Sequence, residues 1–341
     1  MRAFVINGPG AAAVEDVPEP EAAPDEVIVD VRRVGICGTD VEFYTGEMQY
    51  LHDGNAAFPM RIGHEWTGLV SAVGDSVDPA WLGKRVTGDT MLGCGRCQRC
   101  RTGHQHVCNF RTELGIRGGR AGALADRMSI PARALLELPD VVDDTLGALV
   151  EPGGNALRAV RGAGVEPGAR VLVLGPGTIG LLVAMFARAS GAEVHLLGKP
   201  GRSSDFAATL GFDGVWTEDD LPTDLAWDAV VDASNAEHLP ARAVELVEPA
   251  GRVVFVGLAG TPSLVDSRAL ALKDVTAVGV LSASGGLQGT IDAYATGVVD
   301  PRPLVAAAVP LEDLAGVFSG TRSHRDGAGP KTHVVIDGAA S

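Results

Sequence analysis

The spacing of hydrophobic residues changes near residue 170 of this chain. Before that point, short apolar runs such as residues 3–6 and 27–34 are separated by glycine, proline and acidic residues, a pattern typical of short strands joined by turns. After it, apolar runs of strand length alternate with helical patterns. The chain is therefore predicted to combine a β-rich first part with an α/β second part built on a doubly wound parallel sheet.

The individual runs place the expected strands. In the second part they are residues 171–174, 193–197, 229–232, 252–257 and 275–280. In the first part, residues 66–73 and 123–130 read as further strands, and near the end of the chain residues 305–309 and 331–336 do so as well.

The stretch VLVLGPGTIG joins the first strand of the α/β part to a helical pattern. Glycines at such a turn let the backbone approach a pyrophosphate, and the free N–H groups of the new helix face it. We therefore expect a dinucleotide here. The predicted binding residues are Gly175, Gly177, Thr178, Ile179 and Gly180.

Charge and composition limit the kinds of partner that the protein is expected to bind. The 341 residues are 46% hydrophobic, and 43 acidic against 28 basic residues give a formal charge of −15, which disfavours nucleic acid and anionic membranes. The first ten residues lack the apolar region of a signal peptide, so a cytoplasmic location is expected. Five cysteines, an odd number, favour metal binding over disulfides.

One candidate metal site combines Cys37, His64 and Glu65. Cysteine, histidine and carboxylate are zinc ligands, and three protein ligands with one open position define a catalytic rather than a structural site. Spacing alone does not establish that the three converge.

A second candidate site is contained in one segment. Its spacing, CxxCxxCx₇C, allows four thiolates to surround one zinc ion; an iron–sulfur cluster is the alternative, although the ferredoxin ending Cys-Pro is missing. His104 and His106 lie between the last two cysteines and are expected to be solvated. The predicted ligands are Cys94, Cys97, Cys100 and Cys108.

These motifs, in this order and together with Glu151-Pro152, resemble the zinc-containing medium-chain dehydrogenase/reductase family over nearly the whole chain. The resemblance implies a discontinuous GroES-like catalytic domain, residues 1–150 and 287–341, with the structural-zinc lobe at about residues 93–109. It implies a Rossmann domain at residues 151–286 and an active site between the two.

The resemblance also implies roles for the site residues. Catalytic zinc would take Cys37, His64 and Glu151, with Glu65 able to exchange in as a ligand; the alternative for Glu151 is a carboxylate at a helix start. Thr39 would relay a proton and Asp40 would orient the ligands. Glu42, where alcohol dehydrogenases often have histidine, would receive the proton, bind a substrate hydroxyl or be a surface acid.

The cofactor preference rests on the end of the strand at residues 193–197. NAD-binding folds place an acid there, whereas this chain has Gly198, Lys199, Arg202 and Ser203 and no acid before Asp205. NADP is therefore expected, with NAD possible. By resemblance, Lys331 would approach the pyrophosphate.

The resulting hypothesis is a zinc- and NADP-dependent dehydrogenase with two zinc ions per chain, acting on a small alcohol, polyol or sugar-like molecule. A secondary-alcohol or threonine dehydrogenase is the alternative within enzymes. A non-catalytic nucleotide-binding protein of the same fold is the alternative outside them. Residues 275–280 resemble the family's dimer-forming strand, so a homodimer or homotetramer is expected.

Overall fold

The computed structural model describes residues 1–321 and 327–336, which fall into two compact units. The β unit comprises residues 1–151 and the described parts of 305–327 and 331–341. The α/β unit comprises residues 152–304 and 328–330. Residues 337–341, included in the expected first domain, lie outside the described residues.

The boundary between the units differs from the expected one. Residues 287–304 were assigned to the catalytic domain, but they belong to the α/β unit. The reason is α10 (Leu287–Ala295), whose buried face includes Tyr294. The Tyr294 ring stacks on Phe186 of α6 (Thr178–Ala189), with 6.2 Å between ring centroids.

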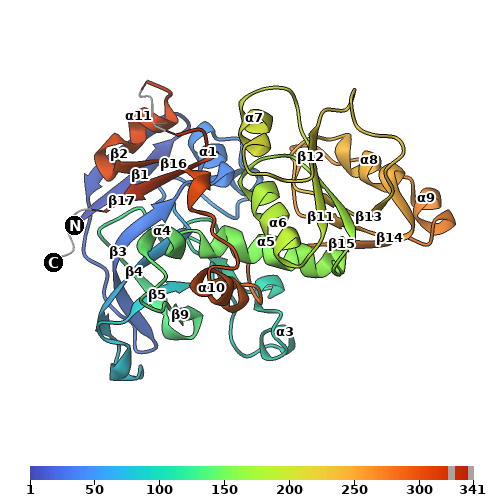
Figure 1. Ribbon diagram of the computed structural model, residues 1–341. Coiled ribbons are helices and arrows are strands. Elements are labelled where there is room, and N and C mark those ends of the chain that lie inside the picture. The colour runs from blue at the N-terminus through green and yellow to red at the C-terminus, as the bar shows by residue number, and fades with distance from the viewer. Residues whose placement is uncertain (322–326, 337–341) are drawn as a thin grey trace. The chain divides into compact units, whose positions relative to one another are not determined.

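The β unit is built on a seven-stranded sheet (Figure 1). Its strand order is β16-β17-β3-β4-β5-β9, and β8 pairs with β3. The strands are β3 (Glu26–Gly35), β4 (Glu65–Val73), β5 (Arg85–Gly88), β8 (Arg127–Pro131), β9 (Leu135–Glu137), β16 (Val305–Pro310) and β17 (Lys331–Val335). Its core contains the fully buried side chains of Phe4, Phe43, Ile62 and Trp66.

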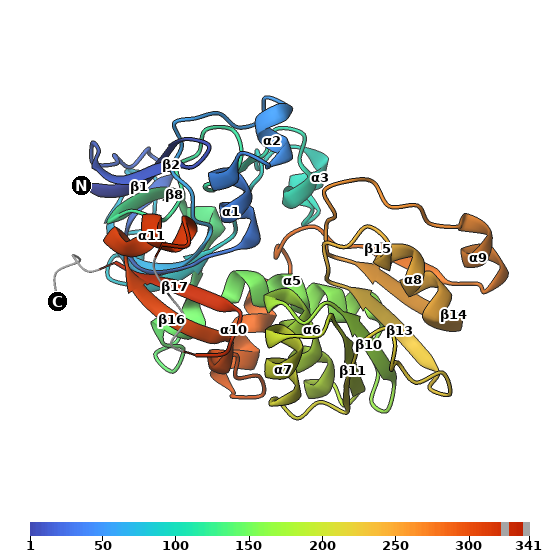
Figure 2. The ribbon, with the colours of Figure 1, turned by 90° about the horizontal axis from the view of Figure 1, so that it is seen from above.

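Smaller elements complete this unit. Figure 2 shows the hairpin of β1 (Arg2–Gly8) and β2 (Ala11–Asp16) near the strands from the end of the chain, and Arg2 forms an ion pair with Glu312. A two-stranded sheet joins β6 (Met91–Leu92) to β7 (Thr112–Glu113). The helices are α1 (Gly38–Thr45), α2 (Gln49–His52), α3 (Gln98–Arg101), α4 (Asp144–Gly147) and α11 (Leu314–Phe318), with 3₁₀ turns η1 (Pro79–Trp81), η2 (Gln105–Val107), η3 (Ala132–Ala134) and η5 (Leu311–Asp313).

The α/β unit contains a six-stranded parallel sheet in the order β12-β11-β10-β13-β14-β15. The strand order reverses between β10 and β13, which is the doubly wound topology predicted from the alternating pattern. The strands are β10 (Arg170–Leu174), β11 (Glu193–Leu197), β12 (Gly214–Trp216), β13 (Trp227–Asp232), β14 (Val247–Phe255) and β15 (Thr276–Gly279).

Helices cover both faces of this sheet, with α6 and α7 (Arg202–Ala208) on one side and α8 (Leu239–Leu246) on the other (Figures 1 and 2). Every residue of α6 from Gly180 to Ala187 is buried, because this helix packs directly on the sheet. The remaining elements are α5 (Val150–Ala163), α9 (Ser267–Leu272) and the 3₁₀ turn η4 (Arg302–Leu304).

Candidate active site

The strand pairing of the β unit brings Cys37, His64 and Glu65 together. Cys37 follows the last residue of β3 by two positions, and Glu65 begins β4, where it pairs with Gly35. One ligand atom from each of the three lies within 4.8 Å of the others. Thiolate, imidazole and carboxylate at this spacing fit the ligand set of a zinc ion.

Asp40 lies behind two of these residues and is completely buried. Its Oδ2 accepts a hydrogen bond of 2.9 Å from the Cys37 N–H, and its Oδ1 lies 3.6 Å from His64 Nδ1. Burial alone would lower the pKa of His64, but the Asp40 carboxylate and Cys37 raise it well above the ordinary value. A carboxylate facing Nδ1 favours the tautomer that leaves Nε2 free for a metal.

Lys331 is placed differently from the expectation. It is 2% exposed, and its ammonium lies 2.6 and 2.8 Å from the two carboxylate oxygens of Glu65. It also donates to the Ile36 carbonyl at 2.9 Å. The Lys331 ammonium is thus buried in the β unit and paired with Glu65, so it is not exposed to a ligand as the expectation required.

The other expected catalytic residues are near the metal group in sequence. Thr39 is half-buried in the first turn of α1. Partial burial and the neighbouring Glu47 carboxylate raise the pKa of Glu42, although its side chain still reaches solvent. Glu151 is 7% exposed in the first turn of α5, and it is not among the three residues within 4.8 Å of one another.

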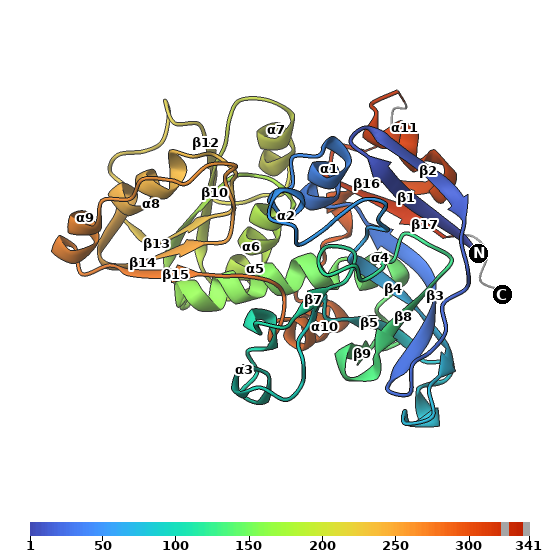
Figure 3. The same cartoon turned by 180° about the vertical axis from the view of Figure 1, so that it is seen from behind.

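The four other cysteines form a second group in a lobe around α3 (Figure 3). Their Sγ atoms lie 3.5 Å apart for Cys97–Cys100, 3.7 Å for Cys97–Cys108 and 4.0 Å for Cys94–Cys100. A tetrahedron with Zn–S bonds of about 2.3 Å has edges of about 3.8 Å. These three distances, with all four Sγ atoms within 4.8 Å of one another, fit one zinc ion.

The local electrostatics of the lobe favour thiolates at some positions. Backbone N–H groups of Arg96 and Cys97 lower the pKa of the Cys94 thiol to about 6. One expectation fails here: His106 is only 8% exposed rather than solvated, because η2 turns it inward, whereas His104 is exposed.

The glycine motif forms the expected strand–turn–helix. Gly175 has a φ of +96°, which favours glycine, and a Cβ on Gly180 would lie 1.9 Å from the Gly175 carbonyl oxygen. Gly177 caps α6 without a side-chain partner, and nothing lies within 4 Å of where its Cβ would be. The first N–H groups of Thr178, Ile179 and Gly180 are thus available to an anion.

The end of β11 carries the residues expected to select the cofactor. Gly198 follows the strand, and Lys199, Arg202 and Ser203 are all exposed. The Lys199 carbonyl accepts a hydrogen bond from Ser204, which shapes the turn into α7. Two cations thus lie at the position where NAD-binding folds have an acid.

Two features were missed from the sequence. One is the buried Lys331–Glu65 pair, and the other is His333, completely buried two positions further along β17. The available signal was Lys331 and His333 at a spacing of two within an apolar strand, which puts both side chains on one face. Within the described residues, no helix has the length and apolar composition needed to cross a bilayer.

Comparison with known proteins agrees with this architecture. Residues 23–140 match the model of the alcohol dehydrogenase GroES-like domain, and residues 178–296 match that of the zinc-binding dehydrogenases. The chain is 33% identical to 2-dehydro-3-deoxy-L-galactonate 5-dehydrogenase of Pseudoalteromonas atlantica, over 86% of this chain and 87% of the relative. It is 28% identical to L-threonine 3-dehydrogenase of Rhizobium etli, over 92% of this chain and 93% of the relative.

A solved structure extends the likeness to three dimensions. A protein from Sinorhizobium meliloti 1021 described as a zinc-binding dehydrogenase, bound to NADP, superposes with a TM-score of 0.88 at 26% identity and 98% coverage of both chains. The non-catalytic alternative is therefore set aside. With both domain models matched in order and the motif residues in place, the chain belongs to the zinc-containing medium-chain dehydrogenase/reductase family and is an oxidoreductase.

Proposed function

We propose that this enzyme oxidises a hydroxyl group of a polyol or sugar-like molecule with NADP as the hydride acceptor. The observation that carries the proposal is the convergence of Cys37, His64 and Glu65 in front of the buried Asp40. The similarity to a sugar-acid dehydrogenase supports the substrate class. A threonine-like amino alcohol is the second candidate, favoured by the similarity to threonine dehydrogenases.

The residues that would hold the catalytic zinc are Cys37, His64 and Glu151. Glu65 is neutralised by Lys331, so its use as a ligand requires that ion pair to be broken. We therefore place Glu151 as the third ligand at rest and Glu65 as the exchanging one. The four cysteines of the lobe would hold the structural zinc, giving two ions per chain.

When bound, zinc supplies Lewis acidity toward the substrate hydroxyl, and NADP supplies a hydride acceptor. The chain's own residues handle the proton and the geometry. The Thr39 hydroxyl passes the proton outward, and Glu42, whose pKa is raised and whose side chain reaches solvent, receives it. Asp40 holds His64 in its metal-binding tautomer.

The preference for NADP rests on Gly198 and the exposed Lys199, Arg202 and Ser203 at the end of β11. Similarity to a structure that binds NADP supports it. In K199A and R202A, the KM for NADP is expected to rise roughly fivefold or more, while the KM for NAD changes little. Equal increases in the KM for NADP and for NAD would refute the preference for NADP.

We also propose a homodimer formed through β15, with a tetramer as the alternative. This strand is at the edge of the sheet with Thr276 and Ala277 exposed, and Leu258 and Leu272 are 79% and 82% exposed. An uncovered edge strand is a ready site for pairing. A277K is expected to dissociate the dimer in light scattering, and an unchanged mass would refute this interface.

The reaction is tested by absorbance of the reduced nicotinamide with polyols, aldoses, secondary alcohols and threonine, using NADP or NAD. Activity confined to polyols or sugars, lost with a chelator and restored by zinc, is the expected result. Activity with threonine alone would favour the second candidate. Chelator-resistant activity would refute the metal assignment. Enzyme activity detected in fractionated cells would test the cytoplasmic location, which the free thiols favour.

A further inference from the structure

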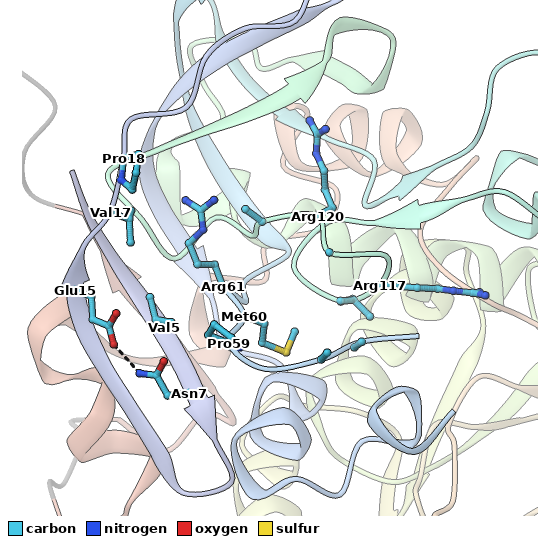
Figure 4. A pocket seen from close by; sticks show the side chains of 15 residues that line it. Val5, Asn7, Glu15, Val17, Pro18, Pro59, Met60, Arg61, Arg117 and Arg120 are labelled. Carbon is cyan, nitrogen blue, oxygen red and sulfur yellow. Dashed lines mark hydrogen bonds between the residues drawn. The ribbon is translucent and has the colours of Figure 1, made fainter. Parts of the chain in front are cut away.

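The β unit contains a pocket of about 410 Å³ that does not include the metal group (Figure 4). It lies between the β1–β2 hairpin and two loops, residues 56–61 and 116–121. Much of its wall is apolar, formed by Val5, Val17, Pro18, Pro59, Met60 and Ile116. This volume and this mixture of apolar wall and few polar groups are typical of small-molecule sites.

Arg61 supplies a half-buried positive charge to the pocket. Burial lowers the pKa of its guanidinium, and no carboxylate within the described residues offsets that effect. Removing a charge from water without a counter-ion is costly. A guanidinium held in this way is suited to receive an anion from solution.

The two neighbouring arginines are already engaged. Arg120 forms an ion pair of 2.7 Å with Glu26, and Arg117 lies over the Tyr50 ring at 5.5 Å. In Figure 4 Arg117 extends away from the other lining residues, whereas Arg61 lies among them. The one acid of the lining, Glu15, accepts a hydrogen bond of 2.6 Å from Asn7. Arg61 is therefore the group that remains to bind a ligand.

The backbone positions Arg61 before any ligand arrives. Met60 exchanges two hydrogen bonds of 2.9 Å with Ile6 of β1, and the Arg61 carbonyl accepts one of 2.9 Å from Gly122. These bonds fix the backbone at Arg61, so a ligand has to order only the Arg61 side chain when it binds.

We propose that this pocket binds a small organic carboxylate, with Arg61 pairing with the carboxylate and the apolar wall covering the rest of the molecule. A single guanidinium fork matches the two oxygens of one carboxylate. Phosphate is less suited, because Arg120 is committed to Glu26 and the wall offers little for a fully polar ion.

The test is calorimetric titration of the zinc-loaded full-length protein with benzoate, its neutral counterpart benzamide, and inorganic phosphate. Benzoate is expected to bind the wild type, and R61Q is expected to weaken that binding roughly tenfold or more. R117Q, which removes a lining arginine that points away, is expected to stay within about threefold. Should R61Q not fold, R61K is expected to bind about three- to tenfold more weakly.

Several results would overturn the proposal. If benzoate binds at a zinc ion and not at Arg61, R61Q would bind it as tightly as the wild type does. Equal affinity for benzamide would mean that the charge is irrelevant, and binding of phosphate but not benzoate would exclude the carboxylate class. Absence of benzoate binding to the wild type at millimolar concentrations would also refute it.

Discussion

Replacing His333 by valine is expected to stabilise the protein, and more so at acidic pH. His333 is completely buried, and neither ring nitrogen has a hydrogen-bond partner among the described residues. A buried polar group without a partner costs about 1–3 kcal/mol. Valine is close in size and favours strands, so H333V removes this cost without a large cavity.

The pH dependence follows from the charges around the ring. Burial, the Lys331 ammonium and the Arg33 guanidinium all lower the pKa of His333 well below its ordinary value of 6.5. The folded state therefore keeps the ring neutral, whereas the unfolded chain takes up a proton as pH falls below that value. Stability is lost as pH decreases, by about 1.4 kcal/mol between pH 7.5 and 5.5. H333V abolishes this loss.

The assay is thermal unfolding of wild type and H333V at both pH values, with zinc present. At pH 7.5 we expect the unfolding midpoint of H333V to exceed that of the wild type by about 2–4 °C for each kcal/mol gained. At pH 5.5 we expect the difference between the two midpoints to be larger. H52V, which replaces an exposed histidine of α2, is the control and should show no such pH dependence. A lower midpoint for H333V, or an equal difference at both pH values, would refute the reasoning.

Three further predictions concern the metal sites and the proton. C97S should lower the zinc content measured by atomic emission from two ions to one per chain, and an unchanged content would exclude the four-thiolate site. K331M should keep its zinc but lose roughly tenfold or more in kcat, because Glu65 becomes an unpaired competing ligand. K331R, which keeps a cation beside Glu65, should lose less, and an equal loss in both variants would contradict this role. E42Q should lower kcat about a hundredfold. It should also flatten the acidic side of the profile of kcat/KM against pH, because the wild type loses activity there when Glu42, whose pKa is raised, takes up a proton. An unaltered profile would make Glu42 a surface acid.

Local patterns were sufficient for most strands. The apolar run at residues 193–197 coincides with β11, and the glycine motif lies between β10 and α6 as expected. These signals succeed because strand length, turn residues and helix period are all encoded within a few neighbouring positions. Strand β2 was missed since its small residues, AAAVED, lack a clear alternation.

Contacts between distant segments were harder to predict. Lys331 and Glu65 are 266 positions apart, and their pairing depends on the register of β17 against β3 and of β3 against β4. A one-residue shift in either register would turn these side chains to the other face of the sheet. The assignment of residues 287–304 to the catalytic domain was wrong for a similar reason, because the packing of Tyr294 on Phe186 holds these residues in the α/β unit.

Gly35 connects these observations. It is the last residue of β3, and its φ is not positive. Position 35 requires glycine because there is no room for a side chain: a Cβ there would lie 2.2 Å from Glu65 Oε2. His333 pairs with this same residue across the sheet. A side chain at position 35 would therefore push Glu65 away from Lys331, so this glycine maintains the buried ion pair beside the metal ligands.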